Sequence, residues 1–246
     1  MPTSRYERAA RRAGYQVIAG LDEAGRGALF GPVFAAAVVL DPDRPIRGLD
    51  DSKQLAPERR DVLATRIRGR AFAWAVAAAD AFEIDRVNIL EAARLAMQRA
   101  VSRLNEQLRA KELGDKPLRN SKPETDAPGG EVCQCDYLLV DAVKVDVAVT
   151  QKALIRGDAL CFSIAAASIL AKVERDAALT AWDRVFPEYG LAHNKGYATP
   201  EHIAALERFG PTTLHRFSFE PVRNVSRYGT WTGYPLPQQG ELFACL

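Results

Sequence analysis

Four acidic residues each follow a short apolar segment of the kind that forms a buried strand. They are Asp22 and Glu23 after residues 17–21, Asp141 after residues 137–140, and Asp158 a few positions after residues 153–155. In open α/β sheets, binding sites form beyond the carboxyl ends of the strands. Carboxylates gathered there repel one another unless a divalent cation neutralises them, and an all-oxygen ligand set suits Mg2+ or Mn2+ rather than Zn2+. The pattern therefore indicates a metal site.

Each of these residues also has a simpler interpretation when it is taken alone. Asp141 could be an ordinary turn residue at a strand end, and Asp158, which lies just before a predicted helix, could be only its N-cap. Neighbouring strand residues normally point to opposite faces of a sheet. Asp22 and Glu23 can therefore share a site only if the strand becomes irregular there, and Gly25 is placed to allow this.

The segments that must position these carboxylates alternate between strands and helices. Strands are predicted at residues 17–21, 33–40, 72–79, 137–140 and 153–155, and helices at 57–70, 87–111 and 160–179. The gap between the first two strands is too short for a parallel crossover, so they should form an antiparallel hairpin. The whole order indicates an α/β fold, with a mixed sheet flanked by helices.

The expected domain organisation follows from the same pattern. Residues 17–180 form the main α/β domain, and residues 181–227 form a small, mainly helical C-terminal part. Residues 1–16 are a basic N-terminal segment, and residues 228–246 are an irregular tail. Residues 111–136 contain three prolines, three glycines and no aromatic residue, so they are predicted to be a flexible insertion.

The composition is that of a folded globular protein, with 246 residues of which 48% are hydrophobic and 26% are charged. The formal net charge of +2 points to no particular partner. Residues 1–16 and 208–227 each contain four arginines against one glutamate, and could contact a nucleic-acid backbone or simply face solvent. No apolar run is long enough for a membrane span or a secretory leader, so a cytoplasmic protein is expected.

The cysteines and glycines exclude two other kinds of site. Cys133 and Cys135 are separated by one residue, which is not the usual spacing of a metal-binding pair, and Cys161 lies in an apolar run that predicts a core thiol. No G-x-G-x-x-G motif follows the first strand, which disfavours a dinucleotide site.

Several short motifs resemble those of the ribonuclease HII family, the type 2 ribonucleases H. They occur in the family's order over about residues 17–222: Asp22-Glu23-Ala24-Gly25-Arg26-Gly27, Gly31-Pro32-Val33, Asp51-Ser52-Lys53, Val140-Asp141, Arg156-Gly157-Asp158, residues 165–176, Lys195-Gly196-Tyr197, and His215-Arg216. The resemblance implies a ribonuclease H-like fold, with a catalytic domain over residues 17–180 and a small helical C-terminal domain.

The resemblance also implies an enzyme, an endoribonuclease that cleaves RNA in RNA–DNA hybrids. It implies incision 5′ of single ribonucleotides in duplex DNA, a step of ribonucleotide excision in DNA replication and repair. The family's catalytic, metal-binding carboxylates correspond to Asp22, Glu23, Asp141 and Asp158. Two Mg2+ or Mn2+ ions would clamp the scissile phosphate, and the products would carry 3′-hydroxyl and 5′-phosphate ends.

Substrate-binding residues are implied by the same resemblance. The turn Gly25, Arg26 and Gly27 corresponds to the reader of the ribose 2′-hydroxyl, and Tyr197 to a tyrosine that packs on the neighbouring sugar. The implied phosphate contacts are Lys53, Ser168 and Lys172. The structural assignments, without a direct role in chemistry, are Asp176, His202 and His215.

The sequence departs from the family pattern at three positions. Arg156 replaces a usual lysine, Ala142 replaces a glycine usual in bacterial members, and Ala56 replaces a serine expected to cap a helix. No carboxylate is lost, so these changes bear on efficiency. A non-catalytic nucleic-acid-binding protein, or a metal nuclease of different specificity, is the alternative interpretation.

The sequence also bears on partners other than the nucleic acid. A monomer is expected, with no membrane association. The C-terminal tail offers one place for a short motif that docks on a sliding clamp, at Gln238, Gln239, Leu242 and Phe243.

Overall fold

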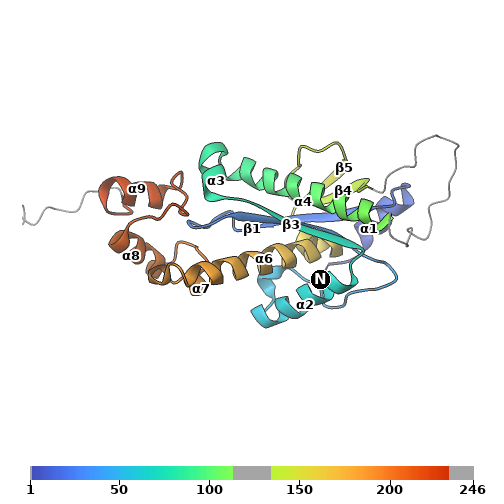
Figure 1. Ribbon diagram of the computed structural model, residues 1–246. Coiled ribbons are helices and arrows are strands. Elements are labelled where there is room, and N and C mark those ends of the chain that lie inside the picture. Colours follow the sequence, from blue (N-terminus) through green and yellow to red (C-terminus); the bar gives the residue numbers. More distant parts are fainter. Residues whose placement is uncertain (1, 113–133, 233–246) are drawn as a thin grey trace, which may run out of the picture. The chain divides into compact units, whose positions relative to one another are not determined.

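The computed structural model describes residues 2–112 and 134–232. Within them the chain forms a mixed five-stranded sheet in the order β3-β2-β1-β4-β5 (Figure 1). The strands are β1 (Ile18–Ala24), β2 (Val33–Val39), β3 (Ala73–Ala79), β4 (Tyr137–Asp141) and β5 (Thr150–Leu154). The expected mixed α/β architecture is confirmed, although the last strand begins earlier than the predicted 153–155.

Strand pairing brings distant segments of the chain together. β1 and β2 form the predicted antiparallel hairpin, whereas β4 lies parallel to β1 and β5 parallel to β4. Leu21 of β1 pairs with Val140 of β4, so the residues that follow them, Asp22 and Asp141, lie where the pairing of these two parallel strands ends, although β1 itself continues to Ala24 beside β2. This register creates the first half of the acidic site.

The described residues also form the following helices. They are α1 (Arg5–Arg12), α2 (Pro57–Arg70), α3 (Ala81–Val87), α4 (Ile89–Glu112), α5 (Gly157–Leu160), α6 (Phe162–Asp183), α7 (Leu191–Asn194), α8 (Pro200–Phe209) and α9 (Glu220–Tyr228), with short 3-10 helices η1 (Ser52–Gln54) and η2 (Pro187–Tyr189). The predicted helix 57–70 is confirmed. The predicted helix 160–179 is found as α6, which begins at Phe162 because the extended backbone of Cys161 separates it from α5, and which runs on to Asp183.

The chain divides into two compact units. Unit 1 comprises Met1–Ala24, Phe34–Ala78 and Ala93–Glu174, and unit 2 comprises Gly25–Val33, Ala79–Ala92 and Arg175–Leu246. Each unit is therefore built from segments far apart in the sequence. The boundary predicted between residues 180 and 181 stays a prediction. Nearly all of the predicted insertion 111–136 and most of the tail 228–246, including the four candidate clamp-docking residues, lie outside the described residues.

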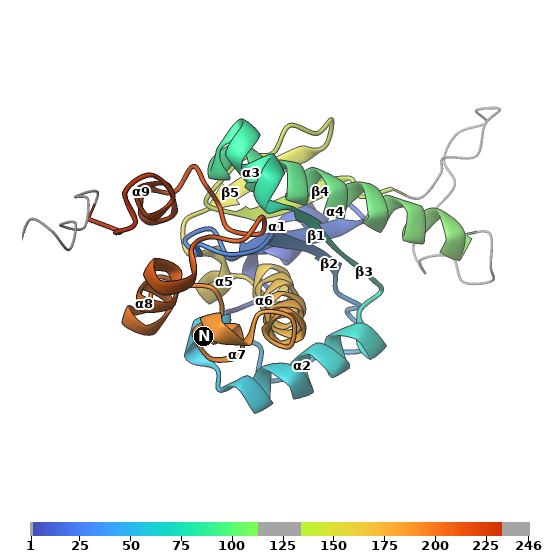
Figure 2. The same cartoon turned by 60° about the vertical axis from the view of Figure 1, so that its left-hand side comes forward.

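The core of unit 1 lies between the sheet and its helices. α2 and the first part of α6 cover one face of the sheet, and α4 lies over the other (Figures 1 and 2). The alanine-rich face of α6 packs on β2 and α2, in a cluster that includes Ala36, Leu63 and Ile67. A Cβ atom on Gly20 would lie 2.0 Å from the backbone of Ser163, so α6 approaches β1 this closely only because residue 20 is glycine.

The core of unit 2 is a smaller cluster rich in aromatic residues. It includes Phe30, Leu179, Tyr189 and Leu206, and all four are almost completely buried. No helix in residues 2–112 or 134–232 is long and apolar enough to cross a membrane.

Candidate active site

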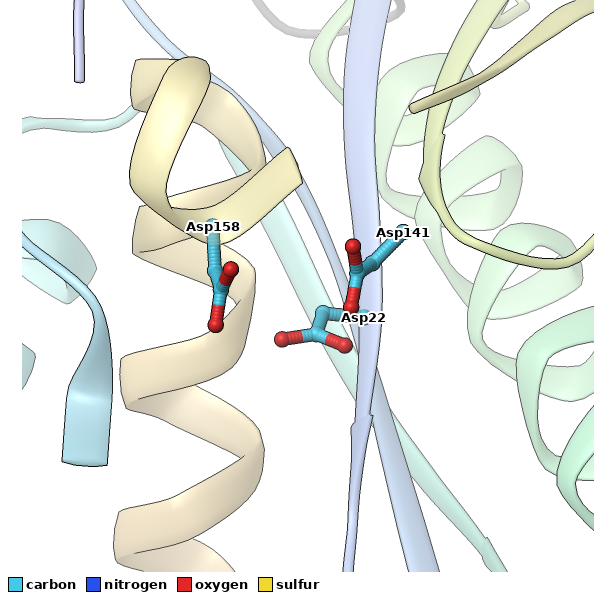
Figure 3. A group of neighbouring side chains, drawn as sticks. All are labelled: Asp22, Asp141 and Asp158. Atoms are coloured by element: carbon cyan, nitrogen blue, oxygen red, sulfur yellow. The ribbon is translucent and has the colours of Figure 1, made fainter. Parts of the chain in front are cut away.

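The side chains of Asp22, Asp141 and Asp158 point toward one another in unit 1 (Figure 3). One carboxylate oxygen from each lies within 4.8 Å of the other two. Asp22 and Asp158 are buried, and Asp141 is half-buried. Of the four carboxylates that the sequence singled out, these three come together.

Two hydrogen bonds hold the segment that carries Asp158 against the ends of β4 and β5. The Gly157 N–H donates to Asp141 Oδ1 at 2.7 Å, and the Ala142 N–H donates to the carbonyl of Leu154 at 2.9 Å. The simpler alternative, in which Asp158 is only a helix N-cap, is wrong, because Arg156 is the N-cap of α5 and Asp158 lies inside that helix. The turn before α5 directs the Asp158 carboxylate toward those of Asp22 and Asp141, and the hydrophobic pattern of the sequence did not predict this turn.

The electrostatics of the cluster favour a bound cation. Burial raises the pKa of Asp22 well above its ordinary value, and the charges of Glu23 and Asp141 raise it further, against hydrogen bonds from Ser168 and the Glu23 N–H that lower it. Burial also raises the pKa of Asp158, together with the charges of Asp51 and Asp141. The protein therefore does not fully neutralise the negative charge of this carboxylate cluster.

The donor set fits a hard divalent cation. Three carboxylates offer only oxygen ligands, which is the preference of Mg2+ and Mn2+. Burial first, and then the charges of neighbouring carboxylates, raise the pKa values of Asp22 and Asp158, and a divalent cation bound between the carboxylates would offset both effects.

Glu23 is placed differently from the three aspartates. It is half-buried at the end of β1, and its backbone N–H donates to Asp22 Oδ1 at 2.7 Å. It is not part of the group of three converging carboxylates. Its predicted role as a fourth metal ligand stays a prediction.

Lys53 lies beside the acidic cluster. Its Nζ is 3.7 Å from Asp158 Oδ2, while 77% of the side chain is exposed. Burial lowers the pKa of Lys53, but the charges of Asp158, Asp51, Asp22 and Asp141 outweigh this and raise it above the ordinary value. An exposed ammonium held next to carboxylates in this way could also meet a phosphate.

Ser168 and Lys172 lie one turn apart on α6. Ser168 is buried, and its hydroxyl hydrogen-bonds to the Ser52 hydroxyl at 2.9 Å and to Asp22. Ser168 therefore contacts a member of the acidic cluster directly, through a contact that the sequence did not reveal. Lys172 is half-buried.

The turn Gly25-Arg26-Gly27 belongs to unit 2. Gly25 is buried with φ +97°, and a Cβ atom there would lie 2.0 Å from Nε of Arg175. Gly27 is exposed, and a Cβ atom there would meet only the Tyr197 ring at 3.9 Å. Hence Gly25 is required by packing, whereas Gly27 leaves open space beside Tyr197, which is itself 36% exposed.

Sequence reasoning gave no role to four residues that make important contacts. Asp51 caps η1 and acts on Asp158 through its charge, and Ser52 is the partner of Ser168. Arg175 and Arg216 are completely buried in unit 2. The signal that the sequence offered was that all four lie inside the motifs shared with the family. The burial of an arginine cannot be inferred from the residues next to it in the sequence.

Comparison with known proteins agrees with this arrangement. The ribonuclease HII family profile matches residues 19–222. A ribonuclease HII from Solibacter usitatus is 57% identical over 222 residues, which cover 90% of this chain and 86% of that protein. The chain belongs to the ribonuclease HII family. Family membership makes it a hydrolase of the endoribonuclease class, and the three converging aspartates lie within the matched region.

Two solved structures give the same fold. Ribonuclease H2 from Pyrococcus horikoshii OT3 superposes with a TM-score of 0.61 at 24% identity, covering 86% of this chain and 98% of that one. The ribonuclease HII of Archaeoglobus fulgidus, solved in a complex with PCNA, gives 0.53 at 26% identity, covering 81% and 91%. The ribonuclease H-like fold expected for this ribonuclease HII family member is confirmed.

Proposed function

We propose that this protein cleaves the RNA strand of RNA–DNA hybrids and incises duplex DNA on the 5′ side of single ribonucleotides. The observation that carries the proposal is the convergence of Asp22, Asp141 and Asp158 in a member of the ribonuclease HII family. Three mutually repelling, partly buried carboxylates are costly unless they bind a cation, and this disfavours a non-catalytic binding protein.

The chemistry expected of the site is hydrolysis of a phosphodiester without a covalent intermediate. Asp22, Asp141 and Asp158, with Glu23 as the proposed fourth ligand, would hold two Mg2+ or Mn2+ ions, which supply an activated water and stabilise the leaving 3′ oxygen. Lys53 adds a positive charge near Asp158, where it can bind a substrate phosphate. The products would carry 3′-hydroxyl and 5′-phosphate ends.

Recognition of the ribonucleotide is assigned to the turn Gly25-Arg26-Gly27 with Tyr197. The exposure of Gly27 and the absence of a clash beside the Tyr197 ring support this assignment, because backbone groups there remain accessible to a sugar. Arg26 is exposed and can pair with a phosphate. Ser168 and Lys172 are proposed as further phosphate contacts.

The decisive experiment is cleavage of an end-labelled DNA duplex that contains one ribonucleotide, in Mg2+, Mn2+ or EDTA. Wild type should incise 5′ of the ribonucleotide only with a divalent ion. Asp22→Asn should lose at least about a hundredfold of the rate, since it removes charge from the acidic cluster. Asp61→Asn, an exposed residue of α2, is the matched control and should retain full activity.

Two results would contradict this proposal. Unchanged cleavage by Asp22→Asn would show that the cluster is not catalytic. Duplex binding without incision in any divalent ion would favour the non-catalytic interpretation.

Partners and location stay proposals. The Archaeoglobus fulgidus relative was solved with PCNA, which supports proposing a sliding-clamp contact. Deleting residues 236–246 should weaken binding to a sliding clamp, and unchanged affinity would remove this proposal. A monomer acting in the cytoplasm, in replication and repair, is the proposed setting.

A further inference from the structure

Two arginines are completely enclosed in unit 2. The exposed fractions of Arg175, in α6, and Arg216, in the segment before α9, are both 0%. Arg175 Nε and Nη1 and Arg216 Nη2 have no hydrogen-bond partner. Burial lowers the pKa of both, and the charge of Arg175 contributes to the lowering at Arg216, so the two cations act on each other. Burying two like charges is costly, which calls for an explanation.

The hydrogen bonds that these arginines make all end on backbone carbonyls. Arg216 donates from Nη1 to the carbonyl of Arg26 and from Nε to the carbonyl of Gly31, both at 2.9 Å. Arg175 donates from Nη2 to the carbonyl of Lys195 at 2.8 Å. Of the accepting carbonyls, that of Arg26 lies in the turn, that of Gly31 lies in the segment that follows it, and that of Lys195 lies two residues before Tyr197.

Packing contacts lead to the same two places. The Arg175 guanidinium occupies the space that a side chain at residue 25 would need, and its Cζ lies 5.1 Å from the centre of the Tyr197 ring. The Leu29 N–H also donates to the carbonyl of Gly196 at 2.7 Å. The two guanidiniums thus fill the space between the turn and the Tyr197 segment and fix both.

We infer that Arg175 and Arg216 are positioning residues for ribonucleotide recognition, which hold the Gly25-Arg26-Gly27 turn against Tyr197. The inference rests on the proposed function of that turn. Neither arginine has exposed surface with which to touch the substrate. Each acts through the backbone atoms and the ring that it holds, and therefore determines how closely a sugar is enclosed.

Lysine is the substitution that separates charge from geometry. It keeps the positive charge, but it cannot reproduce a planar donor that reaches two carbonyls from one side chain. Arg216→Lys loses one of the bonds to Arg26 and Gly31, and Arg175→Lys loses the planar face against Tyr197. Arg208→Lys is the control, because Arg208 is exposed on α8 and lies over the ring of Phe209.

The measurement compares two properties of each variant. One is KM and kcat for a labelled duplex with a single ribonucleotide, and the other is Ki for an all-DNA duplex of the same sequence used as competitor. For Arg175→Lys and Arg216→Lys we expect KM to rise at least about tenfold while Ki stays within about twofold of wild type. A smaller folded fraction would lower kcat alone, so the rise in KM is specific to positioning.

Arg175→Gln and Arg216→Gln provide second variants in case a lysine variant does not fold. Glutamine removes the buried charge and withdraws the donors to the carbonyl of Lys195 or to those of Arg26 and Gly31, so KM should rise without a change in Ki. Variants of Gly25 and Gly27 are not used, since both residues belong to the proposed recognition turn.

Three outcomes separate the possibilities. KM values equal to wild type in the folded variants would overturn the inference. Parallel rises in KM and Ki would also overturn it, because they describe a general loss of DNA binding. If wild type itself binds both duplexes equally, the proposed function of the turn fails before the arginines are tested.

Discussion

Two residues beside the acidic cluster adopt a backbone conformation that suits glycine better. Ala142, directly after Asp141, has φ +54°, and Arg156, two residues before Asp158, has φ +57°. A residue with a Cβ atom pays roughly 1–2 kcal/mol for this left-handed conformation. The strained residues flank Asp141 and Asp158, whose carboxylates point toward each other. At position 142, alanine in place of the family's usual glycine therefore adds backbone strain.

Replacing Ala142 with glycine should stabilise the protein by about 1 kcal/mol, because the strain is relieved and the exposed methyl group leaves no cavity. Urea unfolding measures the effect. Ala177→Gly, at an exposed position of α6, is the control and should destabilise by about 1 kcal/mol. Loss of stability in Ala142→Gly equal to that of the control would contradict the strain.

At the scale of elements, the basic N-terminal segment has a role that its charge did not predict. Its helix α1 buries Glu7, whose Oε1 accepts from the Ser163 N–H at 2.8 Å and from the Cys161 thiol at 3.2 Å. A carboxylate at this position satisfies a free N–H and the positive end of the dipole of α6. The N-terminal segment is therefore anchored to the start of α6, which directly follows α5, the short helix that contains Asp158.

The start of α2 lacks such a cap. Ala56 is its N-cap residue, with extended backbone and no side-chain acceptor. Ala56→Ser should therefore add about 1 kcal/mol to the free energy of unfolding. Ala13→Ser, at the exposed C-cap of α1, offers no cap to the N–H groups at a helix start and serves as the control. Equal effects of the two serines on the urea midpoint would exclude capping as the cause.

At the scale of the whole molecule, neither unit is a continuous stretch of sequence. Unit 2 gathers Gly25–Val33, Ala79–Ala92 and the chain from Arg175 onward. Its core encloses His202 and His215, whose Nε2 atoms are 3.3 Å apart and whose side chains are completely buried. The expectation that these two residues are hydrogen-bonded framework histidines is confirmed.

The histidine pair should make the protein sensitive to acid. Burial and then the neighbouring His202 lower the pKa of His215 from 6.5 to about 3. Below the unfolded-state value the unfolded chain binds a proton that the folded chain does not, so stability present above pH 6.5 is lost as the pH falls toward 3. At pH 5 the loss from His215 should reach about 2 kcal/mol.

Urea unfolding at pH 7.5 and pH 5.0 tests this dependence. In His215→Gln the difference in stability between the two pH values should shrink by about 2 kcal/mol, because the titrating group is gone. His193→Gln removes the remaining, exposed histidine and should keep the wild-type difference. An unchanged difference in His215→Gln would show that the buried pair does not control acid stability.

The local sequence pattern was sufficient to predict many of the strands and helices of this protein. The hairpin of β1 and β2, the helix Pro57–Arg70 and the strand β4 follow from apolar runs, glycines and proline at short range, whereas β1 ends three residues later than its apolar run indicates. The convergence of Asp22 and Asp141 followed from one rule, that parallel neighbours end at the same edge of a sheet. Asp158 was harder, because its position depends on a left-handed backbone conformation at Arg156, where the sequence has no glycine to indicate it.

The sequence by itself determined the family, the mixed α/β sheet and the acidic residues, because these depend on residue type and short-range order. Only the tertiary structure decided that Ser168 contacts Asp22, that Glu7 caps α6, and that Gly25 is a glycine on account of Arg175. Each of these contacts joins segments more than one hundred residues apart. Their energy comes from burial and from hydrogen bonds made in a desolvated interior, and neither exists until the chain has folded.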